Sequence, residues 1–464
     1  MLLPLNAKPY TNVEKLGNQG ISEFVDCYKD DGMNNVARAG LGGSTNNAFA
    51  DIGGSSVLDS FEWETKSVNV SIRNDGKIYK ITSDGTATEI TGATLSGGNP
   101  VSFVDYGDTA YLANGGNIIQ WVYGSGVCSE LTDVDAPTQV THVAVLNSRL
   151  IAREGDNFLA AEAGDPTDWR GIEYEPEMKP DRLVALWADF EEVMLPGSKT
   201  IEFWADTGSA ADPLERLSGT TVEHGTISPY SIAQFDSTYW LLDYMRRVVR
   251  LQVRNPAVVS NPFDNEFQAL SEITDCRILH LPTETTIVLT FATEDKSFAY
   301  DYKRDVWARW TYLDNGVRDR YLGQCACYMR SWNQQLVGSR KDGRIYIASK
   351  DYTADGDNEL MPYLRTGSLN FGTQSWKFPQ GPNALLLKVK RGQVVNPSVE
   401  PYMTMRYKKE NNTWSNPKTV NLGRGGEMNP IGKIRPIGRF RNIEFEFQWD
   451  AASMTSLVSA EINL

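Results

Sequence analysis

The most constraining feature of this chain is a short alternating strand, a tight turn and a second short strand, a unit that recurs along much of its length. Residues 71–81 (SIRNDGKIYKI) place Asn-Asp-Gly at the turn, where positive φ angles are needed. Residues 110–121 (AYLANGGNIIQW) repeat the plan, and residues 341–347 (KDGRIYI) carry nearly the same Asp-Gly-basic-Ile-Tyr core. Reuse of one hairpin unit predicts an all-β protein made of repeated small sheets.

A third version of the unit adds aromatic residues on both sides of the turn. Residues 297–310 (SFAYDYKRDVWARW) resemble a Kelch-like propeller blade, in which the Trp packs between neighbouring sheets. At about 40 to 50 residues a blade, the stretch from about residue 45 to 360 would hold six or seven blades. Helical signals are sparse, and we expect only short helical turns at residues 165–169 (DPTDW) and 229–233 (PYSIA).

The pattern changes near residue 363, where longer strands and basic turns begin. Residues 384–390 (ALLLKVK) read as one such strand, and residues 443–449 (IEFEFQW) alternate apolar and polar side chains at period two. We therefore predict an N-terminal arm contributing platform strands over residues 1–44, a β-propeller over 45–362, and a C-terminal β-rich platform over 363–464. The platform is expected to be sandwich-like or barrel-like and to include the N-terminal arm.

Composition fits a large soluble protein. The 464 residues, 41% of them hydrophobic, can bury a sizeable core, and no apolar run approaches the length of a membrane span. The opening MLLPL lacks the basic start of a signal peptide, so synthesis in a cytoplasm is expected. The cysteines are an odd and scattered set, which predicts free core thiols: Cys27, Cys128, Cys276, Cys325 and Cys327.

Charge argues against a protein that clamps nucleic acid, because the formal net charge is −14 and such proteins carry clustered Lys and Arg. It is compatible with a conduit wall that repels passing DNA, and simple solubility is the alternative explanation. Residues 364–464 have the opposite sign of net charge, with fourteen Lys and Arg and seven Asp and Glu. This basic end predicts a docking surface for an acidic partner, with a solvated sheet face as the alternative.

Motifs for chemistry are missing from the sequence. There is no Gly-x-Ser-x-Gly elbow, phosphate loop or His-Glu-x-x-His helix, and residues 40–44 (GLGGS) lack the strand and third glycine of a nucleotide loop. Residues 351–359 (DYTADGDNE) imitate a calcium loop, but Pro362 stands where the final acid belongs, so an ordinary Asp-Gly turn is expected. We predict no enzyme activity, no cofactor and no metal site.

Several segments form an ordered series along the chain. The central ones are residues 200–208 (TIEFWADTG), 214–216 (LER), 222–233 (VEHGTISPYSIA), 239–243 (YWLLD) and 300–310. The C-terminal ones are Arg406-Tyr407, Thr413-Trp414-Ser415, Gly423, Arg435 and Gly438-Arg439-Phe440. In this order they resemble the tail nozzle proteins of short-tailed phages, also called packaged-DNA-stabilisation proteins or tail accessory factors of the head-to-tail connector. Arg38-Ala39-Gly40-Leu41 resembles a weakened Arg-Pro-Gly-Leu segment near the start of that family.

The resemblance implies a structural virion protein: a hexameric nozzle ring that retains packaged DNA, closes the DNA channel and conducts DNA during ejection. Its implied partners are an adaptor or portal ring, tail fibres or tailspikes, a plug or needle protein, and passing double-stranded DNA bound without sequence specificity. It implies assembly in the host cytoplasm, a place in the virion tail, and no membrane insertion. Six copies carry a formal charge of 6 × −14 = −84.

Two groups of residues are candidates for these roles. Acids in loop-like stretches are predicted to face the DNA channel: Asp105, Asp108, Glu173, Glu175 and Glu177. Basic residues of the C-terminal region are predicted to dock the adaptor: Arg406, Arg435, Arg439 and Arg441. The alternative function is a carbohydrate-binding or carbohydrate-cleaving β-propeller, which would show a solvent-open aromatic pocket with paired carboxylates about 5 to 9 Å apart. A calcium-dependent adhesion module is a second alternative, whose melting temperature would change on adding calcium.

Overall fold

The computed structural model describes residues 1–9, 20–44, 47–176, 181–189, 191–209, 212–379, 384–391, 402–410, 412–422, 431–434, 437–452 and 454–464. Strands make up about 53% of the chain and helices about 3%, which confirms the predicted all-β class. The helical elements of the described ranges are η1 (Glu64–Lys66), η2 (Asn261–Phe263), α2 (Asp264–Gln268) and η3 (Pro282–Glu284). None of these helices has the length and apolar character that crossing a membrane requires.

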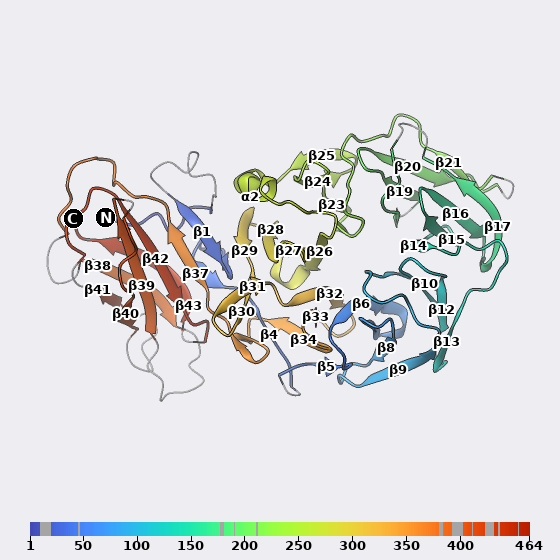
Figure 1. Ribbon diagram of the computed structural model, residues 1–464, viewed down its shortest axis with the longest axis horizontal. Coiled ribbons are helices and arrows are strands. Elements are labelled where there is room, and N and C mark those ends of the chain that lie inside the picture. Colours follow the sequence, from blue (N-terminus) through green and yellow to red (C-terminus); the bar gives the residue numbers. More distant parts are fainter. Residues whose placement is uncertain are drawn as a thin grey trace.

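In the described part of the chain, seven four-stranded units surround one axis and form a β-propeller, which lies on the right-hand side of Figure 1. Blade 1 comprises β6 (Val57–Trp63), β7 (Val68–Arg73), β8 (Ile78–Ile81) and β9 (Ala87–Gly92). Blade 2 comprises β10 (Ser102–Tyr106), β11 (Thr109–Ala113), β12 (Ile119–Val122) and β13 (Val127–Glu130). The outermost strands β9 and β13 pair in parallel, so the first two blades join into one sheet.

Blades 3 to 5 are separate antiparallel sheets. Blade 3 comprises β14 (Val140–Leu146), β15 (Arg149–Glu154), β16 (Asn157–Glu162) and β17 (Asp165–Tyr174). Blade 4 comprises β18 (Trp187–Asp189), β19 (Glu192–Pro196), β20 (Ile201–Asp206) and β21 (Leu214–Arg216). Blade 5 comprises β22 (Ile232–Phe235), β23 (Thr238–Leu242), β24 (Val248–Gln252) and β25 (Asn255–Val258).

The last two blades carry the connections to the rest of the molecule. Blade 6 comprises β26 (Arg277–Leu281), β27 (Thr286–Phe291), β28 (Lys296–Asp301) and β29 (Val306–Arg309), and is followed by the hairpin β30 (Thr311–Asp314) and β31 (Val317–Arg320). Blade 7 takes three strands from the chain after that hairpin: β32 (Gly323–Met329), β33 (Gln334–Ser339) and β34 (Arg344–Ser349). Its fourth strand is β4 (Gly40–Gly42), which pairs antiparallel with β34, so the N-terminal segment closes the ring. Three shorter strands belong to the same sheet: β5 (Ala50–Asp51), β35 (Ala354–Asp355) and β36 (Asn358–Glu359).

Two further sheets form the platform, at the left of Figure 1, where both termini lie. One continues blade 6, because β1 (Ile21–Val25) pairs in parallel with β29. From β1 this sheet continues through β37 (Tyr363–Thr366), β42 (Ile443–Trp449), β39 (Tyr402–Lys409) and β40 (Lys418–Asn421). The other runs in the order β2 (Cys27–Lys29), β3 (Asn35–Ala37), β43 (Met454–Ile462), β38 (Leu385–Arg391) and β41 (Ile431–Ile434). Both sheets share one apolar core, which confirms a platform beside the propeller.

Aromatic side chains fill the spaces between blades. Trp307 of blade 6 is buried in a cluster that also holds Trp240 and Val248 of blade 5, and its Nε1 donates to the carbonyl of Val259 at 2.9 Å. This is the inter-blade position expected for a blade Trp. The boundaries predicted at 44/45 and 362/363 remain a prediction.

Two local expectations are wrong. Residues 165–169 begin strand β17, where Trp169 packs in the core between blades 2 and 3, and Ile232 and Ala233 begin strand β22. In both places an Asp or Pro imitates a helix start, but pairing with a neighbouring strand takes the backbone hydrogen bonds. The cysteine prediction is confirmed, because all five thiols are buried and free.

Candidate functional site

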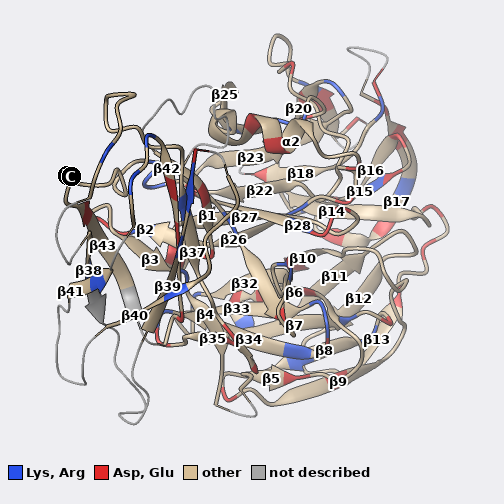
Figure 2. Ribbon diagram, turned by 60° about the vertical axis from the view of Figure 1, so that its left-hand side comes forward, with Lys and Arg blue, Asp and Glu red and all other residues tan. Residues whose placement is uncertain are grey.

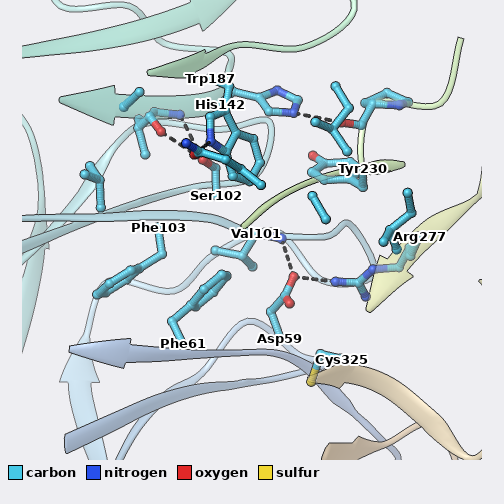
Figure 3. A pocket seen from close by; sticks show the side chains of 18 of the residues that line it. Asp59, Phe61, Val101, Ser102, Phe103, His142, Trp187, Tyr230, Arg277 and Cys325 are labelled. Atoms are coloured by element: carbon cyan, nitrogen blue, oxygen red, sulfur yellow. Dashed lines mark hydrogen bonds and ion pairs between the residues drawn. The ribbon is translucent and has the colours of Figure 1, made fainter. Parts of the chain in front are cut away.

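The first strands of all seven blades face the propeller axis and together line a cavity of about 500 Å³. Hydrogen bonds between blades connect residues of its lining (Figure 3). Arg277 of blade 6 donates through Nη2 to Asp59 Oδ2 of blade 1 at 2.6 Å, and the Val101 N–H donates to the same oxygen at 2.9 Å. Burial raises the pKa of Asp59, and the neighbouring Arg277 opposes that rise.

On the opposite side of the cavity, contacts also connect residues of different blades. His142 Nε2 of blade 3 lies 3.3 Å from the carbonyl oxygen of Pro229, and its ring stacks on Tyr230 with centroids 5.1 Å apart. Trp187 of blade 4 donates from Nε1 to Gln234 of blade 5 at 2.6 Å. Burial lowers the pKa of His142 to about 3, so this imidazole is neutral at pH 7. The cavity on the axis, called the chamber below, is therefore lined by strands that cross-blade hydrogen bonds hold together.

Local sequence patterns do not indicate which residues line the cavity, because these residues come from strands that are far apart in the sequence. Asp59 and Arg277 are separated by 218 positions. One local signal was present, since Asp59 interrupts the otherwise apolar start of β6 and is almost fully buried. A carboxylate inside a buried strand needs a partner, although the sequence does not say which one.

The predicted channel acids that the structure describes all lie in blades 2 and 3. Asp105 is on β10, where burial raises its pKa, and Asp108 follows it at the turn and pairs with Lys66. Glu173 on β17 accepts a hydrogen bond from Asn157 at 2.7 Å, and Glu175 is exposed just after that strand. Glu177 lies outside the described residues. The four therefore share one end of the molecule but do not converge on a single site.

Charge is strongly polarised along the molecule. Residues 100–175, which contain blades 2 and 3, hold twelve Asp and Glu against three Lys and Arg, a net charge of −9. Residues 364–464 have a net charge of +7, from fourteen basic and seven acidic residues. These regions occupy opposite ends of the long axis in Figure 1, and Figure 2 shows blue segments on β38 and β39 and red ones around β17. One end is thus acidic and the other basic.

The predicted docking arginines differ in how their charge is balanced. Arg406 on β39 donates from Nε to Glu446 Oε1 at 2.7 Å, and Glu446 also binds Arg365 at 2.8 Å. Arg439 and Arg441 instead stack over Trp376, with guanidinium-to-ring distances of 5.0 and 4.6 Å, and this Trp is 41% exposed. Arg435 lies outside the described residues.

The Arg439–Arg441 surface follows from strand geometry. An antiparallel bridge between Lys377 and Phe440 turns both of these residues inward, which sends their neighbours Trp376, Phe378, Arg439 and Arg441 outward. Within the described ranges, neither guanidinium has a carboxylate as an ion-pair partner, although the backbone N–H of Arg441 donates to Glu410. We call these four residues the Trp376 surface.

The segment resembling a calcium loop is taken up by structural contacts. Asp355 is buried and binds Arg38 Nη1 at 2.9 Å, and Asp357 accepts from Arg344 at 2.7 Å. Across the part of the chain that the structure describes, no three His, Cys, Asp or Glu side chains are grouped so as to hold a metal ion. Residues 40–42, part of the imitation nucleotide loop, are strand β4 of blade 7.

Among solved structures, the chain is similar to a computationally designed protein, Ika8, and to the WD40 β-propeller domain of Doa1. Ika8 is 16% identical, covers 71% of this chain and 99% of its own, and has a TM-score of 0.39. The Doa1 domain is 13% identical, covers 66% of this chain and 97% of its own, and has a TM-score of 0.43. No curated protein matches.

A family model described as bacteriophage P22 Gp10, β-propeller, matches residues 47–353, about two thirds of the chain. The matched range begins just after β4 and ends after β34, so it contains every blade strand except the closing one. The chain belongs to the bacteriophage P22 Gp10 β-propeller family.

Proposed function

We propose that this protein is the structural subunit of the tail nozzle of a short-tailed phage, which retains packaged DNA and conducts it during ejection. Family membership supports a phage structural role, and the nozzle role is our extension of it. The observation that carries the proposal is the charge polarity, −9 over residues 100–175 and +7 over residues 364–464. A connector subunit needs one surface that repels DNA and another that holds a partner ring.

The DNA path in this proposal runs between subunits. The cavity on the axis of each propeller has a volume of only about 500 Å³, and the Asp59–Arg277 pair lies on one side of it. A double helix, whose major groove alone is about 12 Å wide, has no room there. A closed ring of six copies would supply the conduit, with contacts between two different flanks of each subunit.

Blades 2 and 3 are the best candidates for the conduit wall. In six copies, residues 100–175 would contribute 6 × −9 = −54 formal charges. Fixed charge of this sign repels phosphates over a Debye length of about 8 to 10 Å, so DNA would slide without sticking. Asp105, Asp108, Glu173 and Glu175 belong to this wall in the proposal.

The platform is the proposed docking side. The Trp376 surface joins exposed aromatic rings to two arginines whose guanidinium groups have no carboxylate ion-pair partner among the described residues, and Trp and Arg are enriched in the residues that dominate interface energy. In the proposal it meets an adaptor or portal ring, with tail fibres or tailspikes and a plug protein as further neighbours. Assembly takes place in the host cytoplasm and the mature site is the virion tail.

Imaging tests this directly. The purified protein, alone and mixed with portal and adaptor rings, is imaged by negative-stain electron microscopy. We expect a monomer alone and a six-fold ring on the adaptor, and a persistent monomer beside bare adaptor rings would exclude the proposal. Arg439→Glu with Arg441→Glu should abolish ring capture, whereas Arg182→Glu, at a position 84% exposed in the propeller, should leave it intact.

A further inference from the structure

The chamber on the propeller axis has the dimensions and lining of a small-molecule site. Its volume of about 500 Å³ falls within the range of roughly 300 to 1,000 Å³ that is common for ligand pockets. Phe61 of blade 1 and Phe103 of blade 2 stack at 5.1 Å with an interplanar angle of 11°, and both are only half-buried. Trp187 of blade 4 is also half-buried at the wall. Aromatic side chains are therefore part of the lining, with Phe61 and Phe103 next to each other (Figure 3).

The described residues that line the chamber carry no net charge. Its charged members are Asp59 and Arg277, which pair at 2.6 Å and neutralise each other. The two lining histidines are neutral at pH 7, because burial lowers the pKa of His142 to about 3 and that of His280 to about 4. An ion entering this chamber would lose its hydration without gaining an unpaired counter-charge. The chamber therefore favours an uncharged ligand.

One polar group is left free to bind such a ligand. The Tyr230 hydroxyl makes no hydrogen bond to another described residue, although its ring is held against His142. Burial, with the nearby Asp59, raises the pKa of Tyr230 to about 12, so the phenol keeps its proton and remains a donor. Figure 3 shows Tyr230 on the side of the chamber opposite Phe61 and Asp59. A ligand between them would meet an aromatic face and polar groups together.

We propose that this chamber binds the ring of one neutral sugar. A pyranose has an apolar C–H face that stacks on aromatic rings such as Phe61 and Phe103, and a rim of hydroxyls that pair with Tyr230 and with the Asp59–Arg277 pair. Asp59 is the single carboxylate that the described residues contribute to the lining, and glycoside hydrolysis ordinarily uses two, so the activity is binding without cleavage. Sugar binding is separate from DNA conduction, and a negative result for one proposal would not affect the other.

Saturation-transfer NMR on the full-length protein tests the assignment. The probes are methyl β-glucopyranoside, methyl β-galactopyranoside and N-acetylglucosamine, with glucuronate as the charged comparison. We expect transfer to the ring protons of at least one neutral sugar, with a Kd of about 1 mM, and none to glucuronate. Absence of transfer to all three neutral sugars overturns the proposal, and equal transfer to glucuronate overturns the neutral-ligand argument on which it rests.

Variants locate the binding. Tyr230→Phe removes a hydroxyl that bonds to no described residue, so folding should be unaffected while sugar affinity falls about two- to tenfold. Phe103→Leu should weaken binding by removing the stacking face. Tyr402→Phe, at a platform position that is 52% exposed, is the matched control and should bind like the parent protein. If Tyr230→Phe and Phe103→Leu also bind like the parent, the sugar binds elsewhere and the assignment is wrong.

Discussion

Arg38 is fully buried where the N-terminal segment, the β30–β31 hairpin and blade 7 meet. Its Nε donates to Asp26 at 2.9 Å, its Nη1 to Asp355 at 2.9 Å and its Nη2 to the Thr311 carbonyl at 2.8 Å. A guanidinium presents planar donors in a fixed fork, which lets one side chain tie three segments together. Such a group is stable inside the protein only while all of these partners are present.

Replacement of Arg38 should therefore be costly. Arg38→Met leaves Asp355 buried without its cationic partner, and we expect the free energy of unfolding to fall by about 3 to 5 kcal/mol. Arg182→Met, which removes an 84% exposed arginine from a 3.5 Å pair with Asp156, should change it by less than about 1 kcal/mol. Urea unfolding of both variants makes the comparison, and similar losses in the two would refute the buried-pair argument.

His142 should make stability depend on pH. Its pKa is lowered to about 3 in the folded protein, below the ordinary value of 6.5, so the unfolded chain binds the proton more readily. The stabilisation is complete above pH 6.5 and is lost as pH falls toward 3. At pH 4.5, two units below 6.5, the loss is roughly 2.7 kcal/mol.

Denaturant unfolding at pH 7 and 4.5 measures this effect. In His142→Asn the destabilisation between the two pH values should shrink by about that amount, because the group that titrates is gone. A variant with the same pH dependence as the parent protein would show that His142 is not the source.

At the scale of elements, the closing of blade 7 by β4 ties the N-terminal segment to the far end of the propeller sequence. Gly40 makes this contact possible, since a Cβ there would lie 2.5 Å from the carbonyl oxygens of both Ala354 and Tyr352. The glycines of residues 40–44 that imitate a nucleotide loop thus include one required by close strand packing. The same strand lies next to Asp355, which binds Arg38.

Gly40→Ala should loosen this closure. The added methyl group meets backbone atoms that cannot move aside, and overpacking of this kind costs about 1 to 3 kcal/mol. Hydrogen exchange should rise in β4 and β34 before the rest of the propeller. Gly126→Ala is the matched control, because a Cβ at Gly126 meets open space and its backbone needs no positive φ. Unchanged exchange in β34 of Gly40→Ala would mean that β4 does not limit the stability of blade 7.

The hairpins could be predicted from the sequence, because their turn residues and alternating strands are local features. The turn of residues 71–81 lies between β7 and β8 with Gly76 at φ +85°, and residues 110–121 form the antiparallel pair β11–β12. The alternation of residues 443–449 is also confirmed, because Ile443, Phe445, Phe447 and Trp449 are all buried. The expected helical turns failed because strand pairing outweighed a weak capping signal.

At the scale of the whole molecule, the charge polarity makes the nozzle proposal testable in virions. Neutralising the acids of blades 2 and 3 with Asp108→Asn, Glu173→Gln and Glu175→Gln should slow or stall DNA ejection, because the conduit wall would then repel phosphates less. Ejection is followed by the release of a DNA-binding dye. Glu215→Gln with Glu359→Gln removes exposed acids outside these blades and should leave the rate unchanged. Equal rates in both sets would place the conduit wall elsewhere.

The sequence by itself determined the class of structure, because turn chemistry and period-two alternation act within about ten residues. It also determined the uneven distribution of charge, which is a property of composition. Only the tertiary structure decided which strands meet at the axis, that β4 completes blade 7, and that Asp59 pairs with Arg277 while Arg38 pairs with Asp355. These contacts join residues hundreds of positions apart, and their energy depends on burial and geometry that local patterns do not encode.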